Sequence, residues 1–357
     1  MIQKNNQLTV NSSIKDAIKV IESTSERLAI MFNQDGSVLG TLTDGDIRRA
    51  ILNGISISDY ATMAMNSNPI TARVDDIDSA FDKLLKLNNI RSILLLDSNN
   101  RFVKTYSGPK FINSNLKIPH SLKNTFSFAV IMAGGEGTRL HPITNTLPKP
   151  MIDINGTPLL ERQIINLREI GISKIYISVN YLSDIIQDYF GDGGRWGVEI
   201  HYLNEDKKLG TAGALSLITN IECPVNFLVM NGDILTASNF LNLYHFHKEY
   251  KSQITIGAIN HHVRIPYGVI SHEGNRVVEL KEKPVQSYFC NAGIYALSSD
   301  ILELIPKDTF WNMTDLIDQC LLRSDAVSVF PVHEYWSDIG TPSDLERARQ
   351  NAKKLDL

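Results

Sequence analysis

The sequence contains little cysteine, little net charge and no long apolar run. Only Cys223, Cys290 and Cys320 occur among its 357 residues, and no CxxC pair could hold zinc or exchange disulfides. We therefore expect a reduced, cytoplasmic setting. The 35 Lys and Arg against 39 Asp and Glu leave a net charge of −4. This balance argues against a nucleic-acid-binding surface and against binding to an anionic membrane.

Apolar stretches such as Phe128–Ala133 and Ile93–Leu96 are much shorter than the roughly 18 residues that cross a membrane. The first ten residues are largely polar, so we expect no signal peptide. Hydrophobic residues make up 43% and charged residues 21% of the chain, which is typical of soluble globular proteins. The length then predicts about two domains.

The first 120 residues contain a weak internal repeat. Ile14–Ile21 reads as an amphipathic helix, and Ile77–Leu84 repeats its pattern 63 positions later. A short apolar strand follows each helix, at Leu28–Phe32 and Ile93–Leu96, and a turn and a second strand follow each of these. The pattern predicts two copies of one small α/β unit.

In the first copy, the segment GTLTDGDIRRAIL predicts a turn at Asp44 and Gly45 and a helix that starts near Asp46. Thr43 could offer a hydroxyl to a phosphate, and Asp46 a carboxylate to ribose hydroxyls. The alternative is that Thr43 or Asp44 serves only as a helix N-cap. From the sequence alone, both interpretations stay open.

This region resembles a tandem CBS-domain pair. The strand followed by Gly40, Thr43 and Asp46 matches the adenine-nucleotide signature of that family, which implies an adenine nucleotide as a possible ligand. The second copy departs from the signature, because it places Ser107 and Lys110 at the corresponding positions, and a lysine cannot accept hydrogen bonds from ribose. We expect at most one nucleotide site of the usual kind, or a structural or dimerising module, and a homo-oligomer.

The periodic pattern ends in a polar segment around 113–126, which predicts domains at 1–120 and 127–357 joined by a linker at 121–126. Strands and helices then alternate, which is typical of an α/β domain that gathers ligands beyond the carboxyl ends of its strands. The expected strands are Ala129–Met132, Lys174–Val179, Val225–Met230 and Ile254–Ile259, and the expected helices are Leu159–Glu169, Ser183–Phe190 and Ser343–Lys354.

A glycine-rich loop follows the first of these strands, in the segment AGGEGTRLHPITNTLPKP (Ala133–Pro150). Its glycines allow a polyphosphate to approach backbone amides, and Arg139 and Lys149 supply cations at either end of the loop. No Gly-Lys-Ser/Thr follows, and Leu140 stands where a dinucleotide-binding fingerprint has its third glycine. A tight turn explains Gly134 and Gly135 but not the ordered residues after them.

From about residue 127 to 350 the chain resembles the sugar-1-phosphate nucleotidyltransferases. The resemblance rests on separated motifs in family order: AGGEGTRLHPITNTLPKPM, VNYLSDIIQDYFGDG, LGTAGAL, VMNGDIL, YGVI, EKP, NAGIY and WSDIGTP. It implies a Rossmann-like mixed sheet and transfer of a nucleotidyl group from a nucleoside triphosphate to a sugar 1-phosphate.

The resemblance also implies roles for individual residues. Arg139 would hold the departing pyrophosphate, Lys149 the triphosphate near its α-phosphate, and Lys283 the sugar phosphate. Asp233 follows an apolar strand and Asp338 lies more than a hundred residues later, and two such carboxylates are suited to Mg²⁺ together with phosphate oxygens. The remaining expected contacts are Ala133, Gly134, Gly135, Gly137, Thr138, Glu205, Gly210 and Thr211 for the nucleotide, and Gly268, Glu282 and Asn291 for the sugar.

The residue five positions before Gly210 reads the base in this family, and here it is Glu205. Uridylyl and thymidylyl members resemble one another in placing Gln there. A carboxylate can only accept hydrogen bonds, which suits the N1–H and N2 amine of guanine and opposes the carbonyls of uracil and thymine. We therefore expect GTP, unless the register of NEDKK is shifted by one residue.

The sequence leaves the sugar open among mannose, glucose and glucosamine 1-phosphates. CBS-fused relatives of this kind make GDP-sugars for bacterial surface glycans, including GDP-glucosamine on the route to legionaminic-type sugars, which favours a glucosamine- or mannose-1-phosphate guanylyltransferase. One alternative is uridylyl, thymidylyl or cytidylyl transfer to glucose 1-phosphate. The alternative of another class is an inactive adenylate-sensing regulator, which the presence of all five charged site residues disfavours. Hexapeptide repeats of an appended acetyltransferase are absent.

Overall fold

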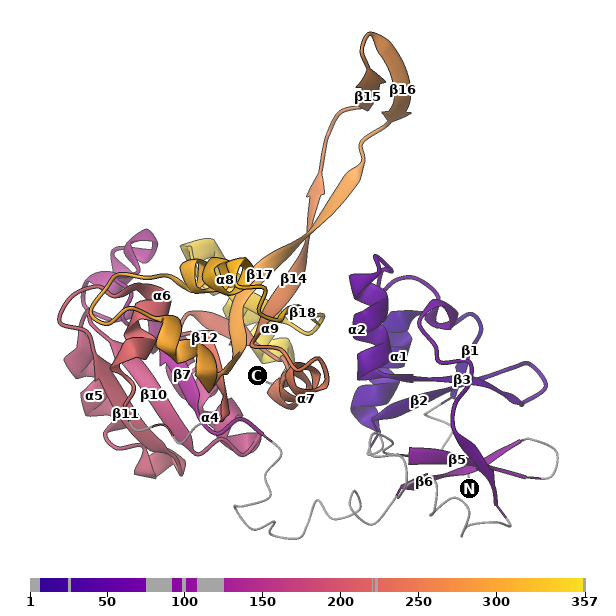
Figure 1. Cartoon of the computed structure of the whole chain (residues 1–357), viewed down its shortest axis with the longest axis horizontal. Helices are drawn as coiled ribbons and strands as arrows, with labels where there is room; N and C mark the ends of the chain where they lie inside the picture. Colours follow the sequence, from indigo (N-terminus) through magenta and orange to yellow (C-terminus); the bar gives the residue numbers. More distant parts are fainter. Residues whose placement is uncertain are drawn as a thin grey trace. The chain divides into compact units, whose positions relative to one another are not determined.

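The computed structural model describes residues 7–24, 27–74, 92–97, 101–107, 125–219, 221 and 224–355 (Figure 1). Contacts between Cα atoms divide the chain into two units, Met1–Leu122 and Lys123–Leu357. Of the expected linker 121–126, residues 121–124 lie outside the described residues.

The N-terminal unit holds two three-stranded sheets, β1-β2-β3 and β4-β5-β6, with the same strand directions. Their registers match at an offset of 64: Leu28 pairs with Thr43 in the first sheet, and Ser92 with Ser107 in the second. The expected second-copy helix Ile77–Leu84 and Lys110 lie outside the described residues. The elements are β1 (Gln7–Thr9), α1 (Ile14–Ser23), β2 (Leu28–Phe32), β3 (Val38–Thr43), α2 (Asp44–Leu52), β4 (Thr71–Arg73), β5 (Ser92–Leu96) and β6 (Phe102–Ser107).

The helices α1 and α2 each begin at a reciprocal capping box. Ser13 and Asp16 cap α1, whose Ile14, Ala17 and Ile21 are buried at helical spacing. Thr43 is the N-cap of α2, so that helix begins at Asp44, two residues before the expected start.

The C-terminal unit is built on a seven-stranded mixed sheet, in which β17 is antiparallel to both of its neighbours. The α/β fold with a Rossmann-like mixed sheet is therefore confirmed. In spatial order the strands are β11 (Glu199–Asn204), β10 (Lys174–Val179), β7 (Ala129–Met132), β12 (Asn226–Asn231), β17 (Val285–Ser298), β14 (Ile254–Arg264) and β18 (Val327–Val332).

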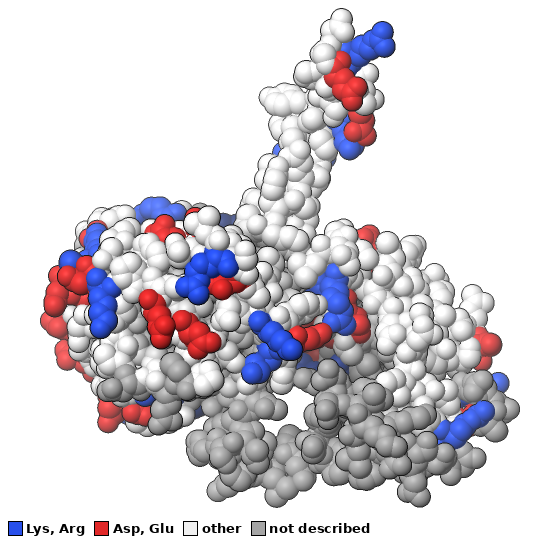
Figure 2. Space-filling model, viewed as in Figure 1, with Lys and Arg blue, Asp and Glu red and all other residues white. Residues whose placement is uncertain are grey.

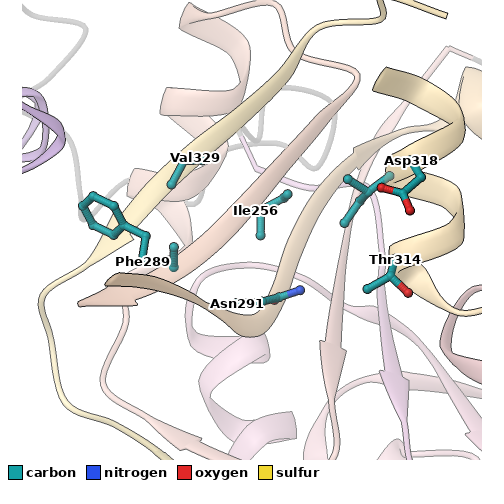
Figure 3. Close-up of a pocket in the computed structure, with 8 residues that line it drawn as sticks. Ile256, Phe289, Asn291, Thr314, Asp318 and Val329 are labelled. Carbon is teal, nitrogen blue, oxygen red and sulfur yellow. The ribbon is translucent and has the colours of Figure 1, made fainter. Parts of the chain in front are cut away.

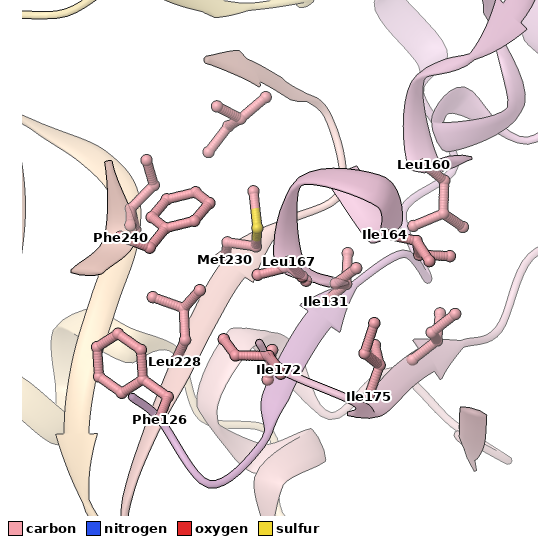
Figure 4. Packing of buried hydrophobic residues seen from close by; sticks show 14 of the residues in the cluster. Phe126, Ile131, Leu160, Ile164, Leu167, Ile172, Ile175, Leu228, Met230 and Phe240 are labelled. Carbon is pink, nitrogen blue, oxygen red and sulfur yellow. The ribbon is translucent and has the colours of Figure 1, made fainter. Parts of the chain in front are cut away.

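Alternating residues of the central strands enter two cores, one on each face of the sheet. Ala129 and Ile131 of β7 belong to one core, and Phe128 and Val130 to the other. Figure 4 shows the first core, where Leu160, Ile164 and Leu167 pack over Ile131 and Leu228. The central strands are therefore buried on both faces, which explains their nearly continuous apolar sequences.

The helices of this unit match the expected ones closely. Leu159–Glu169 and Ser183–Phe190 agree at both ends, and the last helix extends one residue beyond the expected range at each end. Among the described residues, no helix combines the length and apolar character that a membrane crossing requires. The helices are α4 (Leu159–Glu169), α5 (Ser183–Phe190), α6 (Gly210–Gly213), α7 (Phe240–Glu249), α8 (Met313–Leu322) and α9 (Pro342–Leu355).

Two short pairs lie outside the main sheet, β8 (Asp153–Ile154) with β9 (Thr157–Pro158), and β13 (Ile234–Thr236) with β19 (Trp336–Asp338). A third pair is formed by β15 (Val269–Glu273) and β16 (Arg276–Lys281). It lies at the end of a long two-stranded projection in which β14 and β17 continue past the sheet (Figure 1). We call residues 260–289 the arm. The expected strand Ile254–Ile259 covers only the part of β14 inside the sheet.

Candidate active site

Asp233 lies at the carboxyl end of β12, next to the end of β7. The Gly232 N–H donates to the Met132 carbonyl over 2.8 Å, and a Cβ on Gly232 would lie only 2.8 Å from the same oxygen. Only glycine permits this approach of the two strand ends. The Gly-Asp sequence therefore delivers the Asp233 carboxylate to the edge where the glycine-rich loop begins.

A second short strand brings Asp338 to the same place. In the antiparallel pair β13–β19, Asp338 stands opposite Ile234, the residue after Asp233. The Ile339 N–H also donates to the Asp233 carbonyl over 3.0 Å. Two carboxylates more than a hundred residues apart in sequence thus become neighbours.

Lys149 completes a group that we call the charged trio, with Asp233 and Asp338. Its Nζ forms an ion pair with Oδ2 of Asp233 and lies 3.5 Å from Oδ1 of Asp338. The Lys149 side chain is 10% exposed, against 27% for Asp233 and 42% for Asp338. A cation this deeply buried requires compensating charge, and the two carboxylates provide it while keeping one side open to solvent.

The charges of the site perturb one another. Burial, together with the neighbouring Asp233 carboxylate, raises the pKa of Asp338, against the opposing influence of Lys149 and Arg139. Arg139 is exposed and lies on the same side of Gly340 as Asp338. A Cβ added to Gly340 would lie 3.5 Å from Nη1 of Arg139 and 3.5 Å from Oδ2 of Asp338. Arg139 is therefore at the open side of the trio.

Glu205 is held beside the glycine-rich loop by a set of hydrogen bonds. The Ser178 hydroxyl donates to its Oε1, the Leu209 N–H donates to its Oε2 over 2.9 Å, and the Asn180 side chain donates to its carbonyl over 2.7 Å. A Cβ on Gly134 would lie 3.2 Å from Oε1 of Glu205. The carboxylate therefore has a fixed orientation against the loop.

The segment after Glu205 packs against residues 311–313 through Gly210 and Thr211. Gly210 has φ of +76°, and a Cβ there would lie 2.5 Å from the Trp311 carbonyl oxygen. The Thr211 hydroxyl accepts a hydrogen bond from the Met313 N–H over 2.9 Å. In the same segment, the exposed Lys208 forms an ion pair of 2.7 Å with Glu136 of the glycine-rich loop. This ion pair joins the two nucleotide-binding segments expected from the sequence.

A family model described as nucleotidyl transferase matches residues 128–354. The chain belongs to the nucleotidyl transferase family. A CBS-domain model matches residues 3–53. The resemblance to the nucleotidyltransferases is thereby confirmed, and the CBS resemblance is confirmed for the first copy, whereas the pairing with a second copy stays a prediction. Members of the nucleotidyl transferase family generally use a divalent metal ion.

Curated relatives of this chain include a mannose-1-phosphate guanyltransferase of Yarrowia lipolytica, 34% identical over 223 residues, or 60% of this chain and 61% of that one. A mannose-1-phosphate guanylyltransferase of Mycobacterium tuberculosis is 29% identical over 226 residues, or 61% of this chain and 62% of that one. The chain thus spans about three fifths of the length of the curated relatives it matches.

Solved structures agree with the fold. A putative glucose-1-phosphate thymidylyltransferase from Bacillus anthracis, in complex with a sucrose, has a TM-score of 0.52 at 26% identity, covering 63% of this chain and 95% of its own. HddC from Yersinia pseudotuberculosis, complexed with GMP-PN, has a TM-score of 0.50 at 28% identity, covering 63% and 99%.

The charged trio fits a divalent cation. Asp233 and Asp338 supply hard oxygen donors that converge on one position, because a single cation, the Lys149 ammonium, already contacts both. Their partial exposure also leaves room for phosphate oxygens. Asp233 and Asp338 therefore have the chemistry and the placement to hold such an ion.

The structure brings most of the expected nucleotide residues together, but it does not bring the expected sugar residues to them. Gly268, Glu282 and Lys283 lie on the arm and are exposed, and Lys283 has φ of +46°. A Cβ on Gly268 would lie 3.0 Å from Oε2 of Glu282, so these arm residues are neighbours of one another. Within the described residues, no hydrogen bond or ion pair connects them to the charged trio.

Asn291 lies where the arm leaves the sheet. Its side chain donates to the Tyr295 hydroxyl over 2.8 Å and accepts from the Gly293 N–H over 2.9 Å. It also lines an open, largely apolar pocket of about 280 Å³ at the base of the arm (Figure 3). The other lining residues are Ile256, Ala258, Phe289, Thr314, Ile317, Asp318 and Val329.

In the N-terminal unit, Thr43 and Asp46 form hydrogen bonds with each other. The Thr43 N–H and hydroxyl donate to Oδ2 of Asp46, over 2.8 and 2.7 Å, and the Asp46 N–H donates back to the hydroxyl over 3.3 Å. Asp46 also pairs with Arg49 at 2.7 Å. The N-cap interpretation of Thr43 is thus confirmed, and a role in binding an adenine nucleotide stays a prediction.

Sequence reasoning missed the residues that position Glu205. Ser178 is 1% exposed inside a strand, and Asn180 follows that strand directly. A polar residue within an otherwise apolar strand was the available signal for Ser178. Its partner lies 27 positions away, and only the parallel pairing of β10 with β11 brings the two together.

Proposed function

We propose that this protein transfers a nucleotidyl group from a nucleoside triphosphate to a sugar 1-phosphate, giving a nucleoside diphosphate sugar and pyrophosphate. The observation that carries the proposal is the charged trio beside the glycine-rich loop. Nucleotidyl transfer needs placed charges rather than covalent catalysis, and the site offers two cations and two carboxylates. The names of the relatives support the same reaction class.

In this reaction a phosphate oxygen of the sugar 1-phosphate attacks the α-phosphorus. A new oxygen–phosphorus bond forms, and the bond to the β-phosphate oxygen breaks, so pyrophosphate leaves with that electron pair. The Lys149 ammonium neutralises charge near the α-phosphate, and Arg139 at the open side holds the departing pyrophosphate.

We assign the metal to Asp233 and Asp338 and propose that it is Mg²⁺, which prefers one or two carboxylates together with phosphate oxygens. When bound, it supplies positive charge to the phosphates. The backbone of Ala133, Gly134, Gly135, Gly137 and Thr138 would face the triphosphate.

We propose GTP as the nucleotide. Each Glu205 oxygen accepts one hydrogen bond from the protein, and each retains a lone pair for the adjacent guanine donors. The relatives named as guanyltransferases and the structural relative complexed with GMP-PN support this assignment. Gly210 and Thr211 lie in the same nucleotide segment.

For the sugar we propose mannose 1-phosphate or glucosamine 1-phosphate, held by Gly268, Glu282, Lys283 and Asn291. The mannose-1-phosphate names of the relatives favour the first. The structural relative named as a thymidylyltransferase supports the alternative of thymidylyl transfer to glucose 1-phosphate.

A second proposal concerns the N-terminal unit, in which Thr43 and Asp46 would bind an adenine nucleotide that regulates the protein. Binding would exchange the capping box for contacts to phosphate and ribose. Calorimetric titration of the full chain with AMP tests this, and heat that Thr43→Val and Asp46→Ala abolish is expected. Equal heat in wild type and variants, or none in any of them, would instead support a structural pair.

Cytoplasmic location and the domain division at 120 and 127 are proposed on sequence grounds.

The reaction is tested by incubating the full chain with each of GTP, UTP, dTTP and CTP against mannose, glucosamine and glucose 1-phosphates. Pyrophosphate release is measured with and without Mg²⁺, and products are identified by mass. We expect a GDP-sugar that requires Mg²⁺. Similar rates with UTP and GTP would refute the base assignment, and no release with any pair would refute the reaction.

A further inference from the structure

The arm carries an unusual amount of uncovered apolar surface. Large apolar side chains stand 41–74% exposed along its whole length: Val263, Tyr267, Ile270, Val277, Val278, Leu280, Val285, Tyr288 and Phe289. Its stem, residues 260–272 and 284–289, contains a single formal charge, Arg264. Figure 2 shows this stem as an almost uncharged column with the charges gathered near its tip. Apolar surface on this scale is typical of an interface.

The arm is also unsupported within its own chain. Beyond Ile259, β14 pairs only with β17, and β15 pairs only with β16. Among the described residues, the hydrogen bonds and ion pairs of 262–288 all join residues of this same segment, for example His262 with Ser287. An isolated two-stranded ribbon is only marginally stable in water. A partner surface would stabilise it.

What the arm carries identifies the partner. Gly268, Glu282 and Lys283, the sugar-phosphate half of the proposed site, lie together on the arm, at the inner end of the β15–β16 pair. Figure 1 shows β15 and β16 at the outer end of the arm, away from β7 and β12, which are followed in the chain by the glycine-rich loop and by Asp233. One chain therefore presents a triphosphate half and a sugar half that do not meet. The molecule known to contain the complementary half is a second copy of this chain.

We propose that two copies exchange arms, so that Lys283, Glu282 and Gly268 of each copy complete the active site of the other. A two-fold dimer makes the exchange reciprocal and gives two complete sites. The apolar stem would then be covered by the partner's body. Phe289 and the pocket at the arm base extend the same apolar surface onto the body. The catalytic part of this inference rests on the proposed function.

Complementation between inactive variants tests the exchange. Asp233→Asn damages the body half and Lys283→Ala the arm half, so each alone is expected to be inactive. In a co-expressed heterodimer isolated with two tags, exchanged arms leave one of the two sites intact, and about half of the wild-type rate returns. Arms that serve their own body leave no intact site and restore nothing, which would overturn the proposal.

A matched control pairs two lesions in the same half. Lys149→Ala co-expressed with Asp233→Asn leaves every site damaged in either arrangement, so no activity is expected; recovery there would show that rescue does not report arm exchange. Thermal unfolding establishes that each variant folds. If Asp233→Asn does not fold, Asp338→Asn serves as the body-half variant in the complementation test.

A second measurement does not depend on activity. Tyr267, 74% exposed on the arm, is replaced by photoreactive p-benzoylphenylalanine in the full chain, with the same replacement at Tyr250 on the body as control. Arm exchange predicts a cross-linked product of doubled mass on a denaturing gel for the Tyr267 variant alone. It also predicts links to peptides holding Lys149, Asp233 or Asp338.

Links within a single chain, or links confined to arm–arm pairs, would overturn the exchange. If wild type transfers no nucleotide at all, the proposed function fails while the cross-link still decides where the arm lies. The two failures are thus distinguishable.

Discussion

Lys149, Asp233 and Asp338 compensate one another in a site that is only partly open to water. Removing Lys149 would leave two partly buried carboxylates without their cation, so this lysine has both a structural and a chemical role. Burial raises the pKa of Asp338, and the crowding of the two carboxylates adds to this effect. A divalent cation would relieve this crowding, because it would add the positive charge that the two carboxylates lack.

Replacing Asp233 with Asn is expected to keep the fold and lower kcat by about 100-fold or more, a magnitude typical of losing one charged group at a reacting centre. Asp338 still offers Lys149 a partner, so the melting temperature should change little. The measurement is turnover across a wide Mg²⁺ range. Exposed Asp184→Asn on α5 is the control, and near-normal activity of Asp233→Asn would remove this residue from the mechanism.

Glu205→Gln tests the reading of the base. The Gln amide presents donors to the guanine N–H groups, so kcat/KM with GTP should fall about 10- to 100-fold while that with UTP or dTTP rises. Steady-state kinetics with all three nucleotides measure the ratio. Glu199→Gln, at an exposed site paired with His201, should leave it unchanged, and an unaltered GTP preference in Glu205→Gln would contradict the assignment.

At this scale, the sequence predicted the charged residues because each lies in a separate, ordered motif. It did not predict that Lys149 contacts both carboxylates or that Ser178 fixes Glu205. Those contacts depend on the approach of strands that are distant in sequence, and no local pattern encodes it.

Among the secondary-structure elements, the short helix α6 depends most clearly on a glycine. Gly210→Ala would place a Cβ 2.5 Å from the Trp311 carbonyl at a φ of +76°, so we expect the free energy of unfolding to fall by about 2 kcal/mol or more. Denaturant titration measures it. Gly135→Ala, where no atom lies within 4 Å of the new Cβ, is the matched control. Equal stability of the two variants would contradict the packing described for α6.

Helix α7 is attached to the sheet through a buried histidine. His247 is 1% exposed, and its ring nitrogens contact Thr255 Oγ1 at 2.8 Å and Asn226 Oδ1 at 3.3 Å. Burial, with a smaller effect from Lys248, lowers its pKa from 6.5 to about 4. The unfolded chain therefore binds the proton more readily than the folded one between these two values.

Stability should accordingly be complete above about pH 6.5 and fall as the pH drops toward 4. By linkage, this group alone removes about 2 kcal/mol by pH 5. In His247→Gln the difference in unfolding free energy between pH 5 and 7.5 should shrink by this amount, whereas exposed His261→Gln should leave it unchanged. An identical pH dependence in wild type and His247→Gln would contradict the account.

Most elements could be predicted because the central strands are apolar throughout and the helices have apolar residues at helical spacing. The arm could not. Its stem is as apolar as a core strand, yet it is exposed, so hydrophobic pattern alone does not distinguish it from buried structure.

For the whole molecule, an α/β fold and a CBS-like N-terminal part followed from periodicity and motif order. How the two halves of the proposed active site meet did not follow, because a single sequence contains both halves without stating which copy supplies each. Arm exchange would make dimerisation a condition of activity, and the small net charge of −4 does not oppose association of two copies.

The most direct test of the account follows two labels in one reaction with GTP, Mg²⁺ and a sugar 1-phosphate. Phosphorus-32 in the α-position should appear in a GDP-sugar identified by mass, and label in the γ-position should appear only in pyrophosphate. Label from the γ-position in the sugar product, or no transfer from the α-position with either mannose or glucosamine 1-phosphate, would contradict guanylyl transfer by this protein.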